Sequence, residues 1–272
     1  MTTPIFLAHR SIISVTGADA EPFLNNIVTV STTGFAPGEL RYGALLTPQG
    51  KVIADMLLAQ QDGAILIDCD IAAAPALMKR LTLMKLRAAV AIRERGDLGV
   101  RVFDGLADPR SPLAPARSIG PRGEAGDPSA YHAARIAAGL PEQGVDFGAE
   151  DVFPADINMD LNGGVDFRKG CFVGQEVASR MKRRGTARRR TLKVTVAQGA
   201  APSPILANGF EIGMLTSISG GAGLARVRID RLAEAQAKGE TLTMDGAPIA
   251  FDRPDWLAGE LAAIAEAKEA KA

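Results

Sequence analysis

Residues 153–185 read FPADINMDLNGGVDFRKGCFVGQEVASRMKRRG, and no other stretch of this 272-residue chain combines so many special residues. Gly170 and Gly174 flank a three-residue segment that begins at Cys171. Glycine permits a positive φ and a close approach of the backbone to a ligand, which residues with a Cβ adopt at a cost. The stretch therefore predicts a glycine-punctuated loop that leads into a helix from Gly174 to about Met181.

Cys171 has two interpretations. If a helix begins at Gly174, the thiol lies near its positive end and beside Arg168 and Lys169, and both effects favour the thiolate. Cys171 and Lys169 are then the candidate catalytic residues. The alternative is that Cys171 is a small buried hydrophobe, which is the commoner state of a lone cysteine.

The motif Lys169-Gly170-Cys171-Phe172-Val173-Gly174-Gln175-Glu176 resembles the signature Lys-Gly-Cys-Tyr-x-Gly-Gln-Glu of the YgfZ family of folate-binding proteins. Phe172 replaces the usual tyrosine, so one aromatic residue is exchanged for another. Upstream Phe153-Pro154 and the basic residues Arg180 to Gly185 downstream also resemble that family. Weaker similarity extends over residues 10 to 230.

The resemblance implies the fold of the glycine cleavage T-protein, or aminomethyltransferase-like, superfamily. This is an α+β fold of two α/β subdomains and a C-terminal β-barrel, arranged as a ring around a folate-sized hole. The implied cofactor is tetrahydrofolate or a one-carbon derivative, whose flat rings need apolar walls and a few directed polar contacts. The residues expected to bind it are Gly170, Phe172, Gly174, Gln175, Glu176, Arg180 and Asp55.

The same resemblance implies an accessory role in the assembly or repair of iron–sulfur proteins, including enzymes that modify tRNA. The expected partners are a reduced folate and iron–sulfur client or assembly proteins. Cys69 and Cys171 are the only cysteines, too few for the four thiolates that usually hold a cluster. His9 and His132 lack the spacing of metal ligands, so no metal site is expected.

Two departures from the aminomethyltransferases bear on an alternative function, folate-dependent aminomethyl or one-carbon transfer. Ala137 stands where those enzymes have the glutamate that holds the pterin. The segment Gly50-Lys51-Val52-Ile53-Ala54-Asp55 keeps one acid where they have two. Asp55 either acts as a general acid or faces solvent on a strand. We expect no turnover of an aminomethyl-lipoyl carrier.

A basic stretch from Arg180 to Lys193 suggests a second alternative, an RNA-binding module. Guanidinium groups there can bind a folate γ-glutamyl tail, an RNA backbone or an acidic face of a client protein. The stretch has no aromatic platform for stacking bases, which disfavours RNA. A solvated loop and strand surface explains it equally well. Its basic residues are Arg180, Lys182, Arg183, Arg184, Arg188, Arg189, Arg190 and Lys193.

Composition and charge limit the classes of protein and partner that fit this chain. The 47% of hydrophobic residues suffice for buried cores, and 31 basic side chains balance 31 acidic ones, so no overall field favours nucleic acid or membrane. The first residues, MTTPIFLAHRSIISV, lack a basic segment followed by a long apolar core, and no window reaches about 18 apolar residues. These features predict a cytoplasmic protein without a membrane partner.

Periodicity and turn residues predict mixed helices and strands, including an antiparallel meander joined by turns at 47–50 and 61–63. The strands are expected at 12–15, 40–46, 52–58, 64–68, 90–94, 98–103, 191–196, 210–217, 224–228, 241–244 and 248–251. The helices are expected after Asp19, around 77–84, at 129–138, and from residue 256 with Asp255 as its cap.

With these elements, the resemblance implies three regions. Residues 1–185 are expected to form the folate-binding region of two interleaved α/β subdomains, with the signature loop at 165–185. A Pro- and Gly-rich segment at 104–128 marks a junction loop between them. Residues 186–254 form the C-terminal β-barrel. Residues 255–272 are Ala/Glu/Lys-rich and predict a solvated helical tail without a function of its own.

Overall fold

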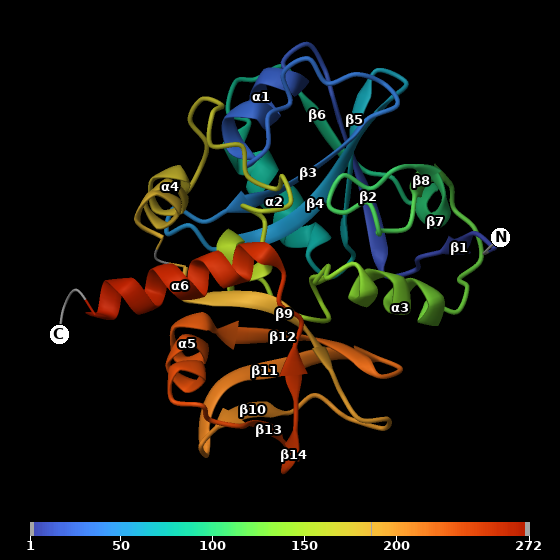
Figure 1. The fold of residues 1–272 in the computed structure, drawn as a ribbon. Helices are drawn as coiled ribbons and strands as arrows, with labels where there is room; N and C mark the ends of the chain where they lie inside the picture. Colours follow the sequence, from blue (N-terminus) through green and yellow to red (C-terminus); the bar gives the residue numbers. More distant parts are fainter. Residues whose placement is uncertain (1–2, 186, 270–272) are drawn as a thin grey trace.

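The structure is a computed structural model that describes residues 3–185 and 187–269. Figure 1 shows an N-terminal body of helices and sheets stacked on a C-terminal β unit. Within these ranges the strands form a five-stranded, a three-stranded and a seven-stranded sheet. The first residue of the predicted barrel region, 186, and the last residues of the predicted tail, 270–272, lie outside the described residues.

The five-stranded sheet has the order β3-β4-β5-β2-β6 with antiparallel neighbours. Asp62 and Gly63 join two of its strands and both have positive φ, as a tight hairpin turn requires. The predicted meander is therefore confirmed. The strands are β2 (Arg10–Thr16), β3 (Leu40–Leu46), β4 (Val52–Gln61), β5 (Ala64–Asp70) and β6 (Ala91–Glu94).

Both faces of this sheet are covered, which explains why every residue of β5 is buried. Helices α1 (Ala20–Ile27) and α2 (Ala74–Met84) pack their apolar sides against one face, in a core with Ile13, Leu58 and Ile67. On the other face, Leu57 belongs to a second core that includes Phe172 from the signature loop. The sheet thus anchors that loop.

A small sheet of order β1-β7-β8 lies beside the first and corrects the predicted junction loop. Residues 104–128 are not loop throughout, because β7 runs on to Leu106 and β8 lies inside the segment. Pairing of β7 with β8 buries Val100 and Val102 beneath Tyr131 of α3, a gain that composition alone does not reveal. The elements are β1 (Ile5–Phe6), β7 (Leu98–Leu106), β8 (Arg117–Pro121) and α3 (Ser129–Ala137).

The C-terminal unit is a seven-stranded sheet of order β14-β13-β10-β11-β12-β9-β15. Asp245 and Gly246 have positive φ and join β13 to β14, between the strands predicted at 241–244 and 248–251. Helix α5 (Ile229–Ala237) was not predicted and packs Leu232 into the core of this unit. The strands are β9 (Arg189–Thr195), β10 (Pro204–Ala207), β11 (Phe210–Ser219), β12 (Ala222–Arg228), β13 (Leu242–Met244), β14 (Ala247–Pro248) and β15 (Ala250–Phe251).

Helix α6 (Asp255–Glu269) begins one residue before the predicted start at 256, and it is more than a solvated tail. Leu257 is 1% exposed within the core of the β unit, and Glu260 accepts hydrogen bonds from Arg190. Figure 1 shows α6 crossing beside the junction of the body and the β unit. No described helix is both long and apolar enough to span a membrane.

Candidate functional site

The signature loop ends at helix α4 (Gln175–Arg184), and two glycines let the start of this helix contact the β3–β4 turn. Gly174 has φ +78°, and a Cβ there would lie 2.6 Å from the Thr47 carbonyl oxygen. Gly50, in the turn itself, has φ +81°, and a Cβ there would lie 2.9 Å from the Val177 Cβ. Neither position accepts a side chain without movement of the backbone. Helix α4 extends beyond the predicted end at Met181 because the chain reverses only at Gly185, in the left-handed conformation.

The Lys169 side chain reaches back to the carboxyl end of α1. Its Nζ donates hydrogen bonds to the carbonyl oxygens of Asn25 at 2.5 Å, Val28 at 2.7 Å and Val30 at 2.9 Å. Burial lowers the pKa of Lys169 to about 8. An ammonium group has three N–H donors, so all of them are used by main-chain carbonyls.

Cys171 and Phe172 face opposite ways. Phe172 is 6% exposed in the core behind the five-stranded sheet, and its ring centroid lies 5.5 Å from the Lys169 Nζ. Cys171 is a free, exposed thiol. The alternative of a buried, packing cysteine at 171 is therefore wrong. That description fits Cys69, which is fully buried and whose pKa is raised to about 12 by burial.

The remaining residues predicted on this segment lie on its outer side. Gln175 and Glu176 line a surface hollow of about 460 Å³ together with Phe167, Ser179, Lys182 and Arg183. Arg180 is exposed on the same helix. A Cβ at Gly170 would meet no atom within 4 Å, so this glycine is not required for space.

A separate cavity of about 640 Å³ lies between the body and the β unit, and its size suits a small organic molecule. None of its lining residues comes from residues 165–185. Asn158 lines it and donates from Nδ2 to the Thr191 carbonyl oxygen at 2.7 Å. Its Oδ1 is buried without a hydrogen-bond partner among the described residues. The walls also include Arg110, Leu140, Leu161, Leu192, Lys193, Arg253, Pro254 and Trp256.

Asp55 does not face solvent, so that alternative is wrong. It is 3% exposed on β4, where Tyr42 Oη donates to its Oδ2 at 3.0 Å and Gln143 Oε1 accepts from its backbone N–H. Its Oδ1 has no partner within the described chain. Burial raises the pKa of Asp55, against the opposing charges of Arg10 and Arg110. Asp55 is thus enclosed within the body and lines neither this cavity nor the hollow beside Gln175 and Glu176.

A buried network of charges escaped the sequence reasoning. Asp68 accepts from Arg10 Nε at 2.6 Å and from Arg117 Nη1 at 2.5 Å, and Asp108 forms a two-pronged pair with Arg110. Asp68, Arg10 and Arg117 come from the strands β5, β2 and β8, and Asp108 and Arg110 share the loop between β7 and β8. Their meeting is visible only in the fold, although charged residues at inward strand positions are a signal of it.

The same network explains both histidines. His9 Nε2 lies 3.1 Å from Glu142 Oε1, which also accepts from Tyr131 Oη at 2.9 Å. The His132 ring stacks on the His9 ring with their centroids 6.0 Å apart. These groups hold a buried carboxylate within the body.

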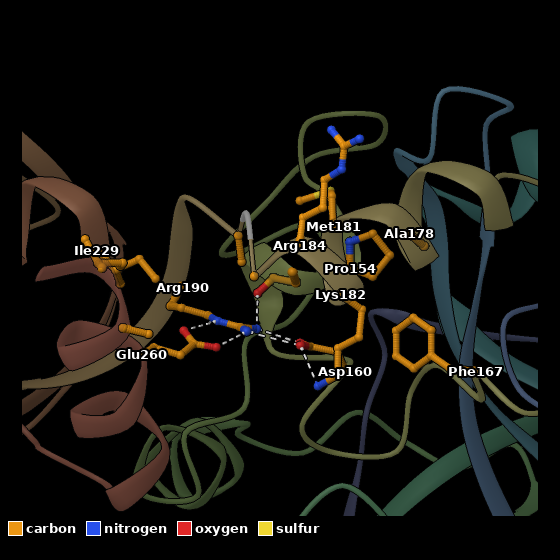
Figure 2. Close-up of a pocket in the computed structure, with 15 residues that line it drawn as sticks. Pro154, Asp160, Phe167, Ala178, Met181, Lys182, Arg184, Arg190, Ile229 and Glu260 are labelled. Atoms are coloured by element: carbon orange, nitrogen blue, oxygen red, sulfur yellow. Dashed lines mark hydrogen bonds and ion pairs between the residues drawn. The ribbon is translucent and has the colours of Figure 1, made fainter. Parts of the chain in front are cut away.

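The basic stretch is divided by the fold. Its members on α4 and at positions 188 and 189 are exposed, but Arg190 is buried between two carboxylates, so its predicted role at a docking surface is wrong. Figure 2 shows its guanidinium between Asp160 and Glu260 of α6. Arg190 donates from Nη1 to Asp160 Oδ1 at 2.5 Å. It forms part of the wall of a mainly apolar pocket of about 280 Å³ between α4, the 3-10 helix η1 (Pro154–Ile157) and α6.

Comparison with known proteins supports the fold in two ways. The family model "CAF17, C-terminal beta-barrel domain" matches residues 188–259. The crystal structure of the glycine cleavage system aminomethyltransferase T from Bartonella henselae is similar to this chain with a TM-score of 0.69. The match covers 91% of this chain and 83% of the Bartonella chain. At 17% identity this similarity concerns the fold alone. The predicted aminomethyltransferase-like fold with a C-terminal β-barrel is confirmed.

Curated relatives have a more specific name. The "Iron-sulfur cluster assembly factor IBA57 homolog, mitochondrial" of Pyricularia oryzae is 30% identical over 86% of this chain and 74% of its own length. The mouse "Iron-sulfur cluster assembly factor IBA57, mitochondrial" is 28% identical over 83% of this chain and 77% of its own length.

These relatives correct two predictions. The signature indicated YgfZ, which is a related family of the same superfamily. The relatives are also named as mitochondrial proteins, which contradicts the predicted cytoplasmic location. The prediction rested on the first residues, which lack a basic segment followed by a long apolar core, and that pattern does not decide the compartment. With 30% identity over most of both sequences, the chain belongs to the family of the iron–sulfur cluster assembly factor IBA57.

Proposed function

We propose that this chain is an accessory factor in the assembly of iron–sulfur proteins, and that it presents the Cys171 thiol to a client or carrier protein. The observation that carries the proposal is the exposed sulfur between two anchored side chains, the partly buried Lys169 and the buried Phe172. Iron–sulfur clusters are held by cysteine thiolates. The names of the relatives support the same role.

Cys171 supplies one ligand and Cys69 is enclosed in the core, so the other ligands of any cluster bound here come from the partner. The cluster is therefore cargo shared between two proteins. The hollow formed by Gln175, Glu176 and their neighbours on α4 is the surface of this chain that faces the partner in this proposal. The clients, among them the tRNA-modifying enzymes expected above, approach this face.

The test is complementation of cells that lack the factor, read as the activity of an iron–sulfur enzyme. Cys171→Ser replaces the soft sulfur ligand with a hydroxyl, so we expect activity to fall to the level of cells without the factor. Cys69→Ala is the matched control, because it also removes a cysteine but leaves the exposed loop unchanged. Full activity of Cys171→Ser contradicts the proposed role.

A reduced folate is the ligand proposed for the 640 Å³ cavity. The residues present fit it: the Asn158 Oδ1 lacks a partner in the described chain, and apolar walls are provided by Leu140, Leu192 and Trp256. Arg253 adds a cation at the wall that suits a glutamate carboxylate. When bound, a one-carbon derivative of tetrahydrofolate would supply its one-carbon group. The chain's own residues bind and orient it there, apart from the signature loop.

Calorimetric titration with tetrahydrofolate tests this assignment. Leu161→Arg places a long charged side chain at the cavity wall, and we expect the affinity to fall about tenfold or more, which corresponds to ~1.4 kcal/mol. Leu83→Arg is the control, since Leu83 is an exposed leucine on α2 outside the cavity. Equal affinity of the two variants, or no binding by the unmodified chain, contradicts the folate site.

Neither alternative function is favoured. The relatives are named as iron–sulfur cluster assembly factors, which disfavours aminomethyl transfer as the main activity. An RNA-binding face would need the basic stretch as one surface, but Arg190 is enclosed between Asp160 and Glu260.

A further inference from the structure

The end of α1 leaves main-chain acceptors that need a donor. In a continuing helix the Asn25 carbonyl would accept from the N–H of Thr29, but that N–H donates to the Ala44 carbonyl oxygen of β3. The chain turns away at Val28, which has extended backbone angles. Three carbonyl oxygens, from Asn25, Val28 and Val30, converge there on the Lys169 Nζ. A lysine can supply donors to the last carbonyls of a helix.

Other contacts hold the preceding part of the loop against the same segment. The Asp166 N–H donates to the Thr29 carbonyl oxygen at 2.9 Å, and Thr29 Oγ1 donates to the Gly164 carbonyl oxygen at 2.6 Å. The Lys169 contacts continue this line of hydrogen bonds to within two residues of Cys171. On the other side of Cys171, Phe172 enters the core.

We infer that Lys169 is a positioning residue, whose ammonium fixes the loop to the end of α1 and so determines where the Cys171 thiol is presented. The inference rests on the proposed role of Cys171. It differs from the expectation that Lys169 is itself catalytic, because every donor of its ammonium is engaged by main chain. Burial lowers the pKa of Lys169, and the negative charge of Asp166 acts in the opposite direction.

The test follows the mobility of a nitroxide attached to Cys171, measured by electron paramagnetic resonance on the full chain. Cys69 is buried, so Cys171 takes the label. We expect a restricted spectrum for the unmodified chain and a mobile one for Lys169→Ala. Methylammonium added to Lys169→Ala should restore restriction, because it places the same three donors among the carbonyls.

Lys169→Arg separates position from charge. A planar guanidinium keeps the positive charge but cannot direct three donors as an ammonium does. We therefore expect Lys169→Arg to stay mobile and to lose assembly activity in the complementation assay. Restriction and full activity of Lys169→Arg would show that charge alone matters, and would overturn the inference.

Lys79→Met is the control, since Lys79 is an exposed lysine of α2 without a polar side-chain contact among the described residues. It should leave the spectrum unchanged. Thermal unfolding of each variant checks that mobility is local. An immobile label in Lys169→Ala refutes the positioning role whatever the assembly assay gives. Normal assembly by Cys171→Ser instead refutes the proposed function and leaves the mobility result standing.

Discussion

At the scale of single residues, the signature motif anchors the chain on both sides of an exposed sulfur atom. Lys169, Phe172 and Gly174 each meet a different part of the body: the end of α1, the core behind the sheet and the β3–β4 turn. Cys171 faces outward between these contacts. The motif therefore specifies a position for a sulfur atom more than a chemical reaction.

The two glycines of the motif are expected to differ in their tolerance of a methyl group. Gly174→Ala places a Cβ 2.6 Å from the Thr47 carbonyl oxygen at φ +78°. We expect the free energy of unfolding to fall by about 2 kcal/mol or more, from left-handed strain and overlap together. Urea unfolding measures it.

Gly170→Ala is the matched control, because a Cβ there meets nothing within 4 Å. We expect a change within about 0.5 kcal/mol, as is usual for a surface substitution. Equal destabilisation of the two variants would mean that the loop does not hold Gly174 against the turn as described.

At the scale of elements, local signals predicted the hairpins well. Asp62-Gly63 and Asp245-Gly246 lie in two-residue turns because their residues accept positive φ, a property that belongs to the residues themselves. Helix α5 and strand β8 were missed because their formation depends on distant partners. Leu232 packs into a core assembled from several strands, and β8 exists through its pairing with β7.

The candidate site shows the same division. The loop and the start of α4 follow from glycine placement, and their existence could be predicted from residues 153–185. The environment of Asp55 could not, since Tyr42, Gln143 and Arg10 reach it from separate segments. The same holds for Arg190, which its place in the basic stretch suggested to be a surface residue and which Asp160 and Glu260 of α6 enclose.

At the scale of the whole molecule, the buried charges join segments that are distant in sequence. Arg117 on β8 pairs with Asp68 on β5, and Thr216 Oγ1 on β11 donates to Asp146 Oδ1 at 2.6 Å. The last of these contacts links the body to the β unit. Acid should therefore weaken the protein by protonating carboxylates that the folded chain keeps ionised.

Asp108 provides a specific pH prediction. Burial would raise its pKa, but the adjacent guanidinium groups of Arg110 and Arg117 hold the pKa down at about 2. The unfolded chain takes up this proton first as pH falls, so the stability from Asp108 is present above about pH 4 and is lost as pH falls through 2. We expect this loss to be about 2 kcal/mol of the free energy of unfolding.

Denaturant titrations between pH 5 and pH 2 check it. Asp108→Asn should be less stable than the unmodified chain at pH 5, and the difference should shrink towards pH 2. Asp62→Asn, in an exposed turn that tolerates asparagine, should follow the unmodified chain throughout. Parallel curves for Asp108→Asn and the unmodified chain would refute the ionised, paired state of Asp108.

The exposed Cys171 is not among the residues that line the 640 Å³ cavity. This separation has a thermodynamic consequence. A ligand in the cavity can influence a partner protein at Cys171 only through the intervening polypeptide. One route is Asn158 and the adjoining η1, whose Pro154 lines the pocket against α4. Such coupling is reciprocal: if the small molecule changes the affinity for the partner by some factor, the partner changes the affinity for the small molecule by the same factor.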